Sequence, residues 1–302
     1  MFEIDRLKRF LHVFGLLLLA VALTGCHSAE PISHDDDRPI YSPKTVDAFV
    51  DAIGPNRIIE LEPEMTYRLD QARRGVSDHY YWVNPLRDEH ELIIRDCPGL
   101  TIRSAGPKRA HLVTRFAYAH VLGFERCDGL ILHRLKLGHA PDPGYCRGGV
   151  VHIKQSKNIT IQHSQLYGCG TEGLALDHVH GLRFDQSIIE DCTYGILSAN
   201  ESRDLLFADA TFQNNREFYG FVFNNTVGIH FKNCFVTKNQ LSTEYETTPL
   251  FRTNLNVPEA MIVFDDGLIT DNQAGVLAQP SGMLKTTKTV IQSNKFAPTK
   301  QR

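Results

Sequence analysis

A self-similar segment in the middle of the chain constrains its fold more than any other feature. Five stretches can be laid on one another, and they begin at Val121, Val150, Leu174, Ile196 and Phe221. The successive starts lie 29, 24, 22 and 25 residues apart. A period of this size indicates a repeat architecture in which each unit stacks only on its neighbours.

Inside each repeat, apolar and polar residues alternate. Ile159/Ile161 and Leu182/Phe184 are matching apolar pairs, and the residue after each is mostly polar. This period of two predicts short, half-buried strands. One turn position carries small or turn-forming residues that tolerate a left-handed backbone, namely Gly129, Asn158, Gly181, Asp204 and Gly228.

Several short strands in each turn of about 22 to 25 residues describe a parallel β-helix. The leucine and asparagine spacing of a leucine-rich repeat is missing, and a β-propeller blade needs a period of roughly 40 residues. We therefore predict an all-β, single-stranded parallel β-helix. Cys169, Cys192, Asn215 and Asn239 fall in one column of the repeats, where stacked asparagines can form a hydrogen-bonded ladder.

The N-terminal segment is typical of an export signal. Basic residues precede an apolar run over residues 10–23, which is shorter than the roughly 20 residues of a membrane span. The Leu-Thr-Gly-Cys sequence that ends at Cys26 resembles the lipobox of bacterial lipoproteins. That resemblance implies a signal peptide over 1–25 and a lipid, such as palmitate, on Cys26.

The same resemblance implies a membrane-anchored protein of the bacterial cell envelope. His27, rather than Asp, follows the cysteine, which implies the outer membrane. The alternative is a plain signal peptide, or a short anchor helix, with an incidental cysteine. Residues 26–44 contain an Asp run and three prolines and are expected to form a disordered tether.

A short amphipathic helix is predicted after the tether. Val46, Phe49, Val50 and Ile53 have helical spacing, and Thr45 can cap the start while Gly54 ends the helix. Because a β-helix has an open apolar end, we expect this helix to plug it. The expected organisation is a cap with the first strands over 45–90 and the β-helix over 91–298.

Composition and cysteine use set further bounds. The chain has 302 residues and a net charge of −3, and no Lys/Arg cluster is visible in the sequence, so we expect no nucleic-acid partner. We also expect a monomer. Six cysteines follow Cys26, and we favour buried, stacked thiols over disulfides, although an exported protein can form either.

Candidate catalytic residues surround an insertion over residues 138–149, since insertions in solenoids often build the binding surface. A lyase needs charge neutralisation at a uronate carboxylate and a base for the adjacent proton. His139, Tyr145 or Arg147 fits these roles. A hydrolase needs two carboxylates, and the available pair is Asp142 with Glu172.

Further rungs add candidate binding residues beside the insertion. Together with Tyr145, the side chains that suit a sugar polymer are Tyr194, Arg216 and Tyr219. Tyrosine rings can pack on sugar CH groups, and arginine can pair with a carboxylate. The alternative is that these positions are ordinary turn residues. We expect no cofactor and no metal, because His178 and His180 have no partner at a metal-site spacing.

The order of features over about residues 46–240 resembles the right-handed parallel β-helix proteins of the pectate-lyase-like superfamily. The matching segments are VLGFERCDGLIL, KNITIQHSQLYGCG, IIEDCTYGI and FADATFQNNREF. The insertion and the LYGCGTEGL segment also resemble a group of uncharacterised bacterial β-helix lipoproteins. The superfamily contains lyases, hydrolases, epimerases and silent binding proteins, so the resemblance implies a fold and several functions.

Two functional hypotheses remain open from the sequence. The first is a lipid-anchored envelope protein that binds a carbohydrate polymer and processes it as a lyase or hydrolase. The second is a non-catalytic envelope scaffold or adhesion module that binds another protein.

Overall fold

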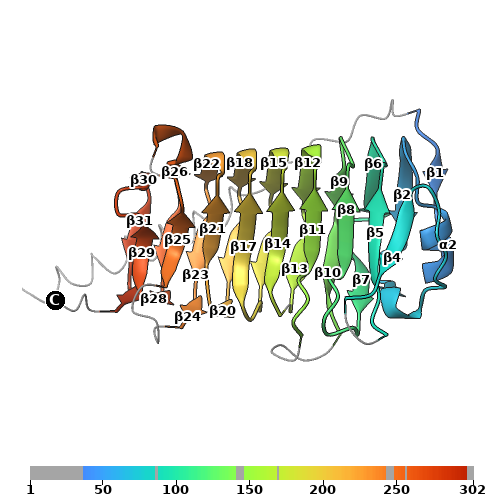
Figure 1. The fold of residues 1–302 in the computed structure, drawn as a ribbon, viewed down its shortest axis with the longest axis horizontal. Coiled ribbons are helices and arrows are strands. Elements are labelled where there is room, and N and C mark those ends of the chain that lie inside the picture. The colour runs from blue at the N-terminus through green and yellow to red at the C-terminus, as the bar shows by residue number, and fades with distance from the viewer. Residues whose placement is uncertain are drawn as a thin grey trace, which may run out of the picture. The chain divides into compact units, whose positions relative to one another are not determined.

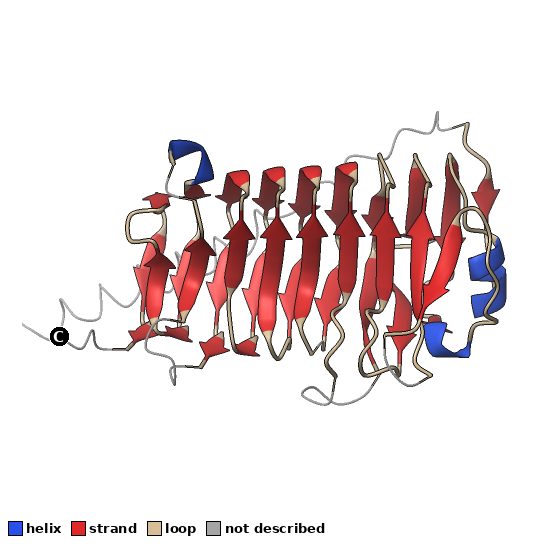
Figure 2. Cartoon of the chain, in the orientation of Figure 1, coloured by secondary structure: helices blue, strands red, loops and turns tan. Residues whose placement is uncertain are grey.

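The computed structural model describes residues 37–85, 88–140, 146–168, 170–242, 248–255 and 257–297. These residues form mainly parallel strands that coil, rung upon rung, into a β-helix (Figure 1). The predicted signal segment, Cys26, Asp142, Tyr145 and Cys169 lie outside the described residues. Strands make up nearly all of the regular structure (Figure 2).

Three long sheets run along the β-helix, and each rung contributes one strand to each of them. Sheet A has 10 strands, in the order β1 (Ile40–Tyr41), β2 (Arg57–Leu61), β6 (Leu100–Ser104), β9 (Ile131–His133), β12 (Lys157–Gln162), β15 (His180–Asp185), β18 (Arg203–Ala208), β22 (Val227–Lys232), β26 (Ile262–Asp265) and β30 (Leu284–Thr287).

Sheet B follows sheet A along each rung. It has nine strands, in the order β3 (Thr66–Arg68), β7 (Ala110–Thr114), β10 (Leu135–His139), β13 (Gln165–Tyr167), β16 (Ile188–Glu190), β19 (Thr211–Gln213), β23 (Phe235–Thr237), β27 (Leu268–Thr270) and β31 (Val290–Gln292).

Sheet C completes each rung. Its nine strands are β4 (Tyr80–Val83), β5 (Glu91–Arg95), β8 (Leu122–Glu125), β11 (Val151–Lys154), β14 (Glu172–Asp177), β17 (Gly195–Asn200), β21 (Phe221–Asn224), β25 (Pro249–Thr253) and β29 (Val276–Gln279). A small sheet D contains β20 (Arg216–Glu217), β24 (Gln240–Leu241), β28 (Gln273–Ala274) and β32 (Lys295–Phe296). Two 3₁₀ turns cover Leu69–Gln71 and Pro258–Ala260.

The strand register confirms the predicted columns. Ile161 lies beside Phe184, and Phe184 lies beside Phe207 on the next rung. The stack continues from Phe207 to Phe231, whose ring centroids are 4.6 Å apart, and on to Phe264 at 5.3 Å from Phe231. These side chains are fully buried, so identical positions on successive rungs build one continuous apolar core.

The corners between sheets also follow the predicted pattern. The five residues of the predicted turn column all have a positive φ: Gly129, Asn158, Gly181, Asp204 and Gly228. Glycine adopts this conformation without steric cost, and Asn and Asp tolerate it better than most residues. The composition of that column is therefore a direct consequence of the corner geometry.

The predicted asparagine ladder is present and is longer than expected. Asn215 and Asn239 are fully buried, and the side-chain amide of Asn215 donates to Oδ1 of Asn239 at 2.9 Å. Asn239 in turn donates to Asn272, and Asn272 donates to Asn294. The backbone N–H of Cys192 donates to Asn215, so the ladder joins five rungs.

The N-terminal cap is an α-helix, α2 (Val46–Asp51), as predicted. Oγ1 of Thr45 accepts a hydrogen bond from the N–H of Ala48 at 3.1 Å. Phe49 and Val50 are buried in the core at the end of the β-helix. The helix ends before Gly54, and ordered structure begins before residue 45 because β1 pairs with β2.

The cysteines are thiols where they are described. Cys97, Cys127, Cys146, Cys192 and Cys234 are free and buried, which confirms the prediction of buried thiols for these five. Within the described part of the chain, no helix has the length and apolar character needed to cross a membrane.

Candidate functional site

The outward face of sheet C is hollowed into a groove of about 500 Å³. Side chains alternate across a strand, so every second residue of a sheet C strand points outward. The lining side chains that we define as the sheet C groove include His120, His152, Lys154, Glu172, Asp177, Ser198, Asn200, Glu201 and Asn224.

Two outward columns form the floor of the groove. In one of them, His152 of β11 aligns with Ala175 and then Ser198 on the following rungs. In the other, Lys154 aligns with Asp177, and that column continues through two asparagines, Asn200 and Asn224. The floor is therefore polar, with small side chains in the middle and hydrogen-bonding groups beside them.

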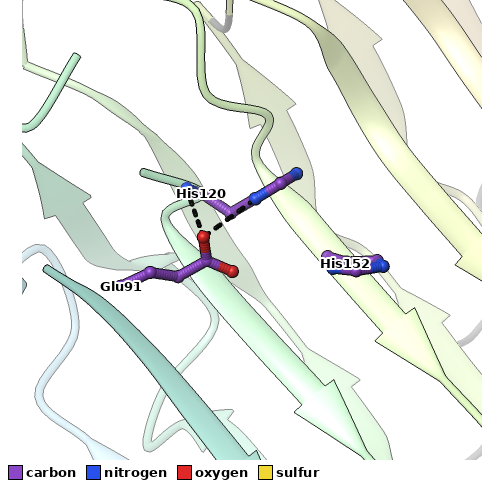
Figure 3. Close-up of side chains that lie close together, drawn as sticks. All are labelled: Glu91, His120 and His152. Atoms are coloured by element: carbon purple, nitrogen blue, oxygen red, sulfur yellow. Dashed lines mark hydrogen bonds and ion pairs between the residues drawn. The ribbon is translucent and has the colours of Figure 1, made fainter. Parts of the chain in front are cut away.

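A buried carboxylate holds the histidine at one end of the groove. Oε2 of Glu91, at the start of β5, accepts hydrogen bonds from Nδ1 of His120 at 3.0 Å and from the His120 backbone N–H at 3.1 Å (Figure 3). The side chain of Glu91 is 7% exposed and that of His120 is 24% exposed. Glu91 thus fixes the imidazole from below while the ring borders the groove.

Two glycines make room for this pair. A Cβ on Gly149 would lie 2.7 Å from Cδ2 of His120, and one on Gly123 would lie 2.4 Å from Cδ1 of Ile93 and 3.2 Å from Oε1 of Glu91. Real Cβ atoms do not approach that closely to a ring carbon, so a larger residue at Gly149 would displace the imidazole. The local sequence therefore accommodates both side chains.

The electrostatics of the pair favour its charged form. Burial opposes the charge on both groups. The hydrogen bond and charge of Glu91, assisted by Glu172, nevertheless raise the pKa of His120 above its ordinary value. The contacts with His120 likewise outweigh burial and lower the pKa of Glu91. His120 therefore keeps its proton to higher pH than an isolated histidine does.

His152 has the opposite character. Its ring stacks on that of His120, with centroids 5.1 Å apart and 30° between the planes, and Figure 3 shows the three side chains together. Burial, followed by the charges of His120 and Lys154, lowers the pKa of His152 to about 4. The two neighbouring imidazoles thus have pKa values shifted in opposite directions, and His120 keeps its proton to a higher pH than His152 does.

Glu172 lies further along the groove and is also held in place. Its Oε1 accepts a hydrogen bond from Oγ of Ser198 at 2.9 Å, and its Oε2 accepts one from the hydroxyl of Tyr219 at 3.0 Å. Tyr219 reaches back across an intervening rung because Gly195 has no side chain; a Cβ there would lie 2.0 Å from the tyrosine ring.

The donor atoms of Glu91, His120 and His152 all lie within 4.8 Å of one another, which makes these residues the candidate metal-binding group among the described residues. Donors around a tetrahedral ion with bonds of about 2.1 Å are roughly 3.4 Å apart. The three donor atoms would have to move closer together to hold one ion.

Of the predicted catalytic residues, the structure brings Glu172 to the groove. His139, in β10, is 2% exposed and its Nε2 lies 3.0 Å from the carbonyl oxygen of Ala119. Burial lowers its pKa to about 4. Arg147 is exposed, and its backbone N–H donates to the carbonyl of Ala117. Neither side chain lines the groove.

Of the predicted binding residues that the structure describes, Tyr219 contacts a residue of the groove, whereas Tyr194 and Arg216 do not line it. Tyr219 contacts Glu172, as described above. Tyr194 instead stacks on the exposed ring of Phe218, with centroids 4.8 Å apart. Arg216 lies in the short strand β20 and is exposed.

The repeat pattern of the sequence does not group Glu91, His120 and His152. His120 falls in the column of Gly149, while His152 lies three residues further along, so no repeat alignment pairs them. One sequence feature could have indicated the contact: Gly149 stands in the column where the preceding rung has His120, a large polar residue. Such a gap allows a side chain to lean from one rung onto the next.

Comparison with protein families matches residues 139–256 to a family described as right handed beta helix region. No curated protein matches the chain. Among solved structures, an alginate lyase from Paenibacillus sp. strain FPU-7 is 10% identical, with a TM-score of 0.46 over 86% of this chain and 98% of that one.

Two further solved structures are similar at the same level. The pectin methylesterase of Aspergillus niger is 10% identical, with a TM-score of 0.47 over 88% of each chain. A pectate lyase from Paenibacillus sp. 0602 is 9% identical, with a TM-score of 0.45 over 88% of this chain and 80% of that one. The strand topology, the register and the family match together identify the chain as a right-handed parallel β-helix protein.

Proposed function

We propose that the sheet C groove binds a carbohydrate polymer and cleaves it by acid–base elimination. The observation that carries the proposal is the contact between two histidines whose pKa values are shifted in opposite directions. Glu91 raises the pKa of His120, and burial lowers the pKa of His152. Neighbouring groups whose pKa values are driven apart are the usual basis for assigning an acid and a base.

Elimination fits these groups better than hydrolysis does. A glycosidase needs one carboxyl group that stays protonated near neutral pH. The pKa of Glu91 is lowered instead, and both oxygens of Glu172 accept hydrogen bonds from hydroxyl groups. Both side chains thus act as hydrogen-bond acceptors, and we assign the role of proton donor to His120.

The proposed step uses a uronic acid unit. His152 takes the proton from the carbon next to the uronate carboxylate, and the electron pair of that C–H bond forms a C=C bond to the neighbouring carbon. The glycosidic C–O bond on that neighbouring carbon breaks, and the leaving oxygen takes the proton of His120. Lys154, two residues from His152 on the same face, offsets the carboxylate charge as the proton leaves.

The rest of the groove supplies binding. Ser198, Asn200 and Asn224 present hydroxyl and amide groups along successive rungs. Rungs are spaced by about 4.8 Å, so a sugar chain lying along the axis meets a new polar side chain at each step. Positioned hydrogen bonds of this kind fix the orientation of a polar ligand.

The test is to incubate the full chain with a panel of polyuronates and neutral polysaccharides and to follow the ultraviolet absorbance of unsaturated uronate. We expect at least one polyuronate to release it, and His120→Asn and His152→Asn to lose activity by about 100-fold or more. Turnover should persist in EDTA, because the proposed step uses no metal.

A matched control is available on another face. His230 of β22 lies 2.8 Å from the carboxylate of Asp265, so His230→Asn removes a similar histidine–carboxylate pair outside the groove. This variant should keep full activity. Binding without turnover across the panel would favour the non-catalytic hypothesis, and a loss of turnover in EDTA that Zn²⁺ restores would contradict the proton-transfer pair.

A further inference from the structure

A second hollow, of about 460 Å³, lies at the corner between sheets A and B. It is separate from the sheet C groove, and the two share no lining residue. We define it as the basic cleft, and its charged and imidazole side chains are Glu64, Lys108, Arg109, His111, Arg134, Lys136 and His163.

Stacking of rungs assembles this cleft from separate parts of the chain. Lys108 and Arg109 precede β7, Arg134 lies at the corner between β9 and β10, and Lys136 is in β10. Lys136 aligns with His111 of β7 on the rung before. Because the basic residues are more than 20 positions apart in two groups, the sequence shows no cluster.

The cleft carries a local positive charge in a chain whose net charge is −3. Four cationic side chains line it against one carboxylate, Glu64. Burial and nearby cations lower the pKa values of His111 and His163, so the two imidazoles are neutral at pH 7. The net charge of the lining side chains at pH 7 is therefore +3, from four cations and one carboxylate.

These cations differ in how they are held. Nε of Arg109 donates to the carbonyl oxygen of His163 at 2.8 Å, which fixes that guanidinium in the wall. The ammonium of Lys136 lies 4.7 Å from the ring centroid of Tyr167. Among the described residues, the guanidinium of Arg134 has no hydrogen-bond or ion-pair partner. Its planar set of donors is therefore available to a ligand.

Acidic residues limit the cleft along the β-helix axis. Glu64 lies on one side, paired with Lys108 at 2.7 Å. On the other side, Gln165 donates to Glu190 of β16, which also accepts from Gln213 at 2.7 Å. These carboxylates would repel a long polyanion that extended beyond the cleft. The positive region spans about two rungs, or roughly 10 Å, which suits a single anionic group.

We propose that the basic cleft binds a phosphate or sulfate ester through its tetrahedral oxyanion. Arg134 supplies a planar pair of donors, Lys136 supplies a mobile ammonium, and the anchored Arg109 forms a fixed positive wall. A group with three terminal oxygens satisfies cations that come from different rungs more completely than a planar carboxylate does. The ester can belong to a soluble sugar or to a lipid headgroup.

The experiment measures binding to the full chain by calorimetry, with inorganic phosphate, sulfate and glucose 6-phosphate as ligands. We expect a Kd of about 1 mM or tighter for at least one of them. Arg134→Gln should weaken binding by about tenfold, the effect of losing one charge-assisted contact. Lys136→Gln should act in the same direction.

Lys157→Gln is the matched control, because Lys157 is an exposed cation at another corner, 3.1 Å from Asp128. Vesicles of phosphatidylcholine with and without phosphatidic acid identify the source of the ester. Binding that needs both phosphatidic acid and Arg134 assigns a lipid headgroup, whereas binding of the soluble ester alone assigns a small molecule. Either of these two results supports the site. The proposal is overturned if no ligand binds in any arm, or if the control weakens binding as much as Arg134→Gln.

Discussion

The buried asparagine ladder gives the sharpest prediction about stability. The side chain of Asn239 takes part in four hydrogen bonds: it accepts from the backbone and side-chain N–H groups of Asn215, and donates to Asn272 and to the carbonyl of Phe212. Asn239 is 0% exposed. Asn239→Ala removes all four bonds and leaves several partners in an apolar interior.

The magnitude follows from those bonds. A typical intramolecular hydrogen bond contributes about 1 kcal/mol net, and a buried group left without a partner costs about 1–3 kcal/mol. Four lost bonds therefore predict a fall of about 4 kcal/mol in the free energy of unfolding. For a body of this size, that corresponds to a Tm lower by roughly 10 °C.

The assay is urea denaturation followed by circular dichroism, with the m-value compared between variants so that a change in cooperativity is recognised. Asn294→Ala is the matched control. Asn294 ends the ladder, is partly exposed, and makes three side-chain hydrogen bonds, so water can replace its contacts and the loss should be about 1 kcal/mol. Equal losses for the two variants would refute the argument from burial.

Three further predictions concern the acid–base groups and the N-terminus. Glu91→Gln removes the partner that raises the pKa of His120, so the alkaline limb of the pH–activity profile should move to lower pH; an unchanged limb would show that Glu91 does not set this pKa. Burial and the adjacent Arg134 lower the pKa of His133 to about 4, below its unfolded value of about 6.5. The contribution of this shift to the free energy of unfolding, about 3 kcal/mol, is fully present above pH 6.5 and is lost as the pH falls towards 4. His133→Gln should flatten the dependence of urea midpoint on pH, and a variant as acid-sensitive as the wild type would contradict this origin. Cys26→Ser should move the protein from the membrane fraction to the soluble fraction, and no shift on fractionation would argue against lipidation.

Much of the fold could be predicted because each rung repeats the same physical problem. An inward strand position must be apolar, as at Phe184 and Phe207, and a corner with positive φ favours Gly, Asn or Asp, as at Gly181 and Asp204. These constraints act on single positions. They therefore produce a periodic pattern that is visible in the sequence alone.

The site is harder to predict from the sequence, because its central contact, between His120 and His152, joins two different columns. His120 leans over Gly149 to meet His152, and Tyr219 crosses Gly195 to reach Glu172. Each contact depends on a glycine: Gly149 lies on the same rung as His152, and Gly195 lies on the rung between Glu172 and Tyr219. A column alignment can reveal residues that share a position, as Glu172 and Tyr219 do, whereas His120 and His152 share none.

The described residues of the insertion over 138–149 have a structural role and do not supply a catalytic side chain to the groove. His139 and Cys146 are buried, and the backbone N–H of Gly148 bonds with the carbonyl of Ala117. These contacts hold the loop against the segment that carries His120. The described insertion residues therefore hold the segment that carries His120 in place.

A side-chain NMR titration of the two groove histidines tests the central claim most directly. The nitrogen shifts of His120 and His152, assigned with the His120→Asn and His152→Asn variants, report each protonation state as the pH changes. The account predicts a doubly protonated His120 that titrates above pH 6.5 and a neutral His152 that titrates near pH 4. Titration of both rings together near pH 6.5 would contradict it.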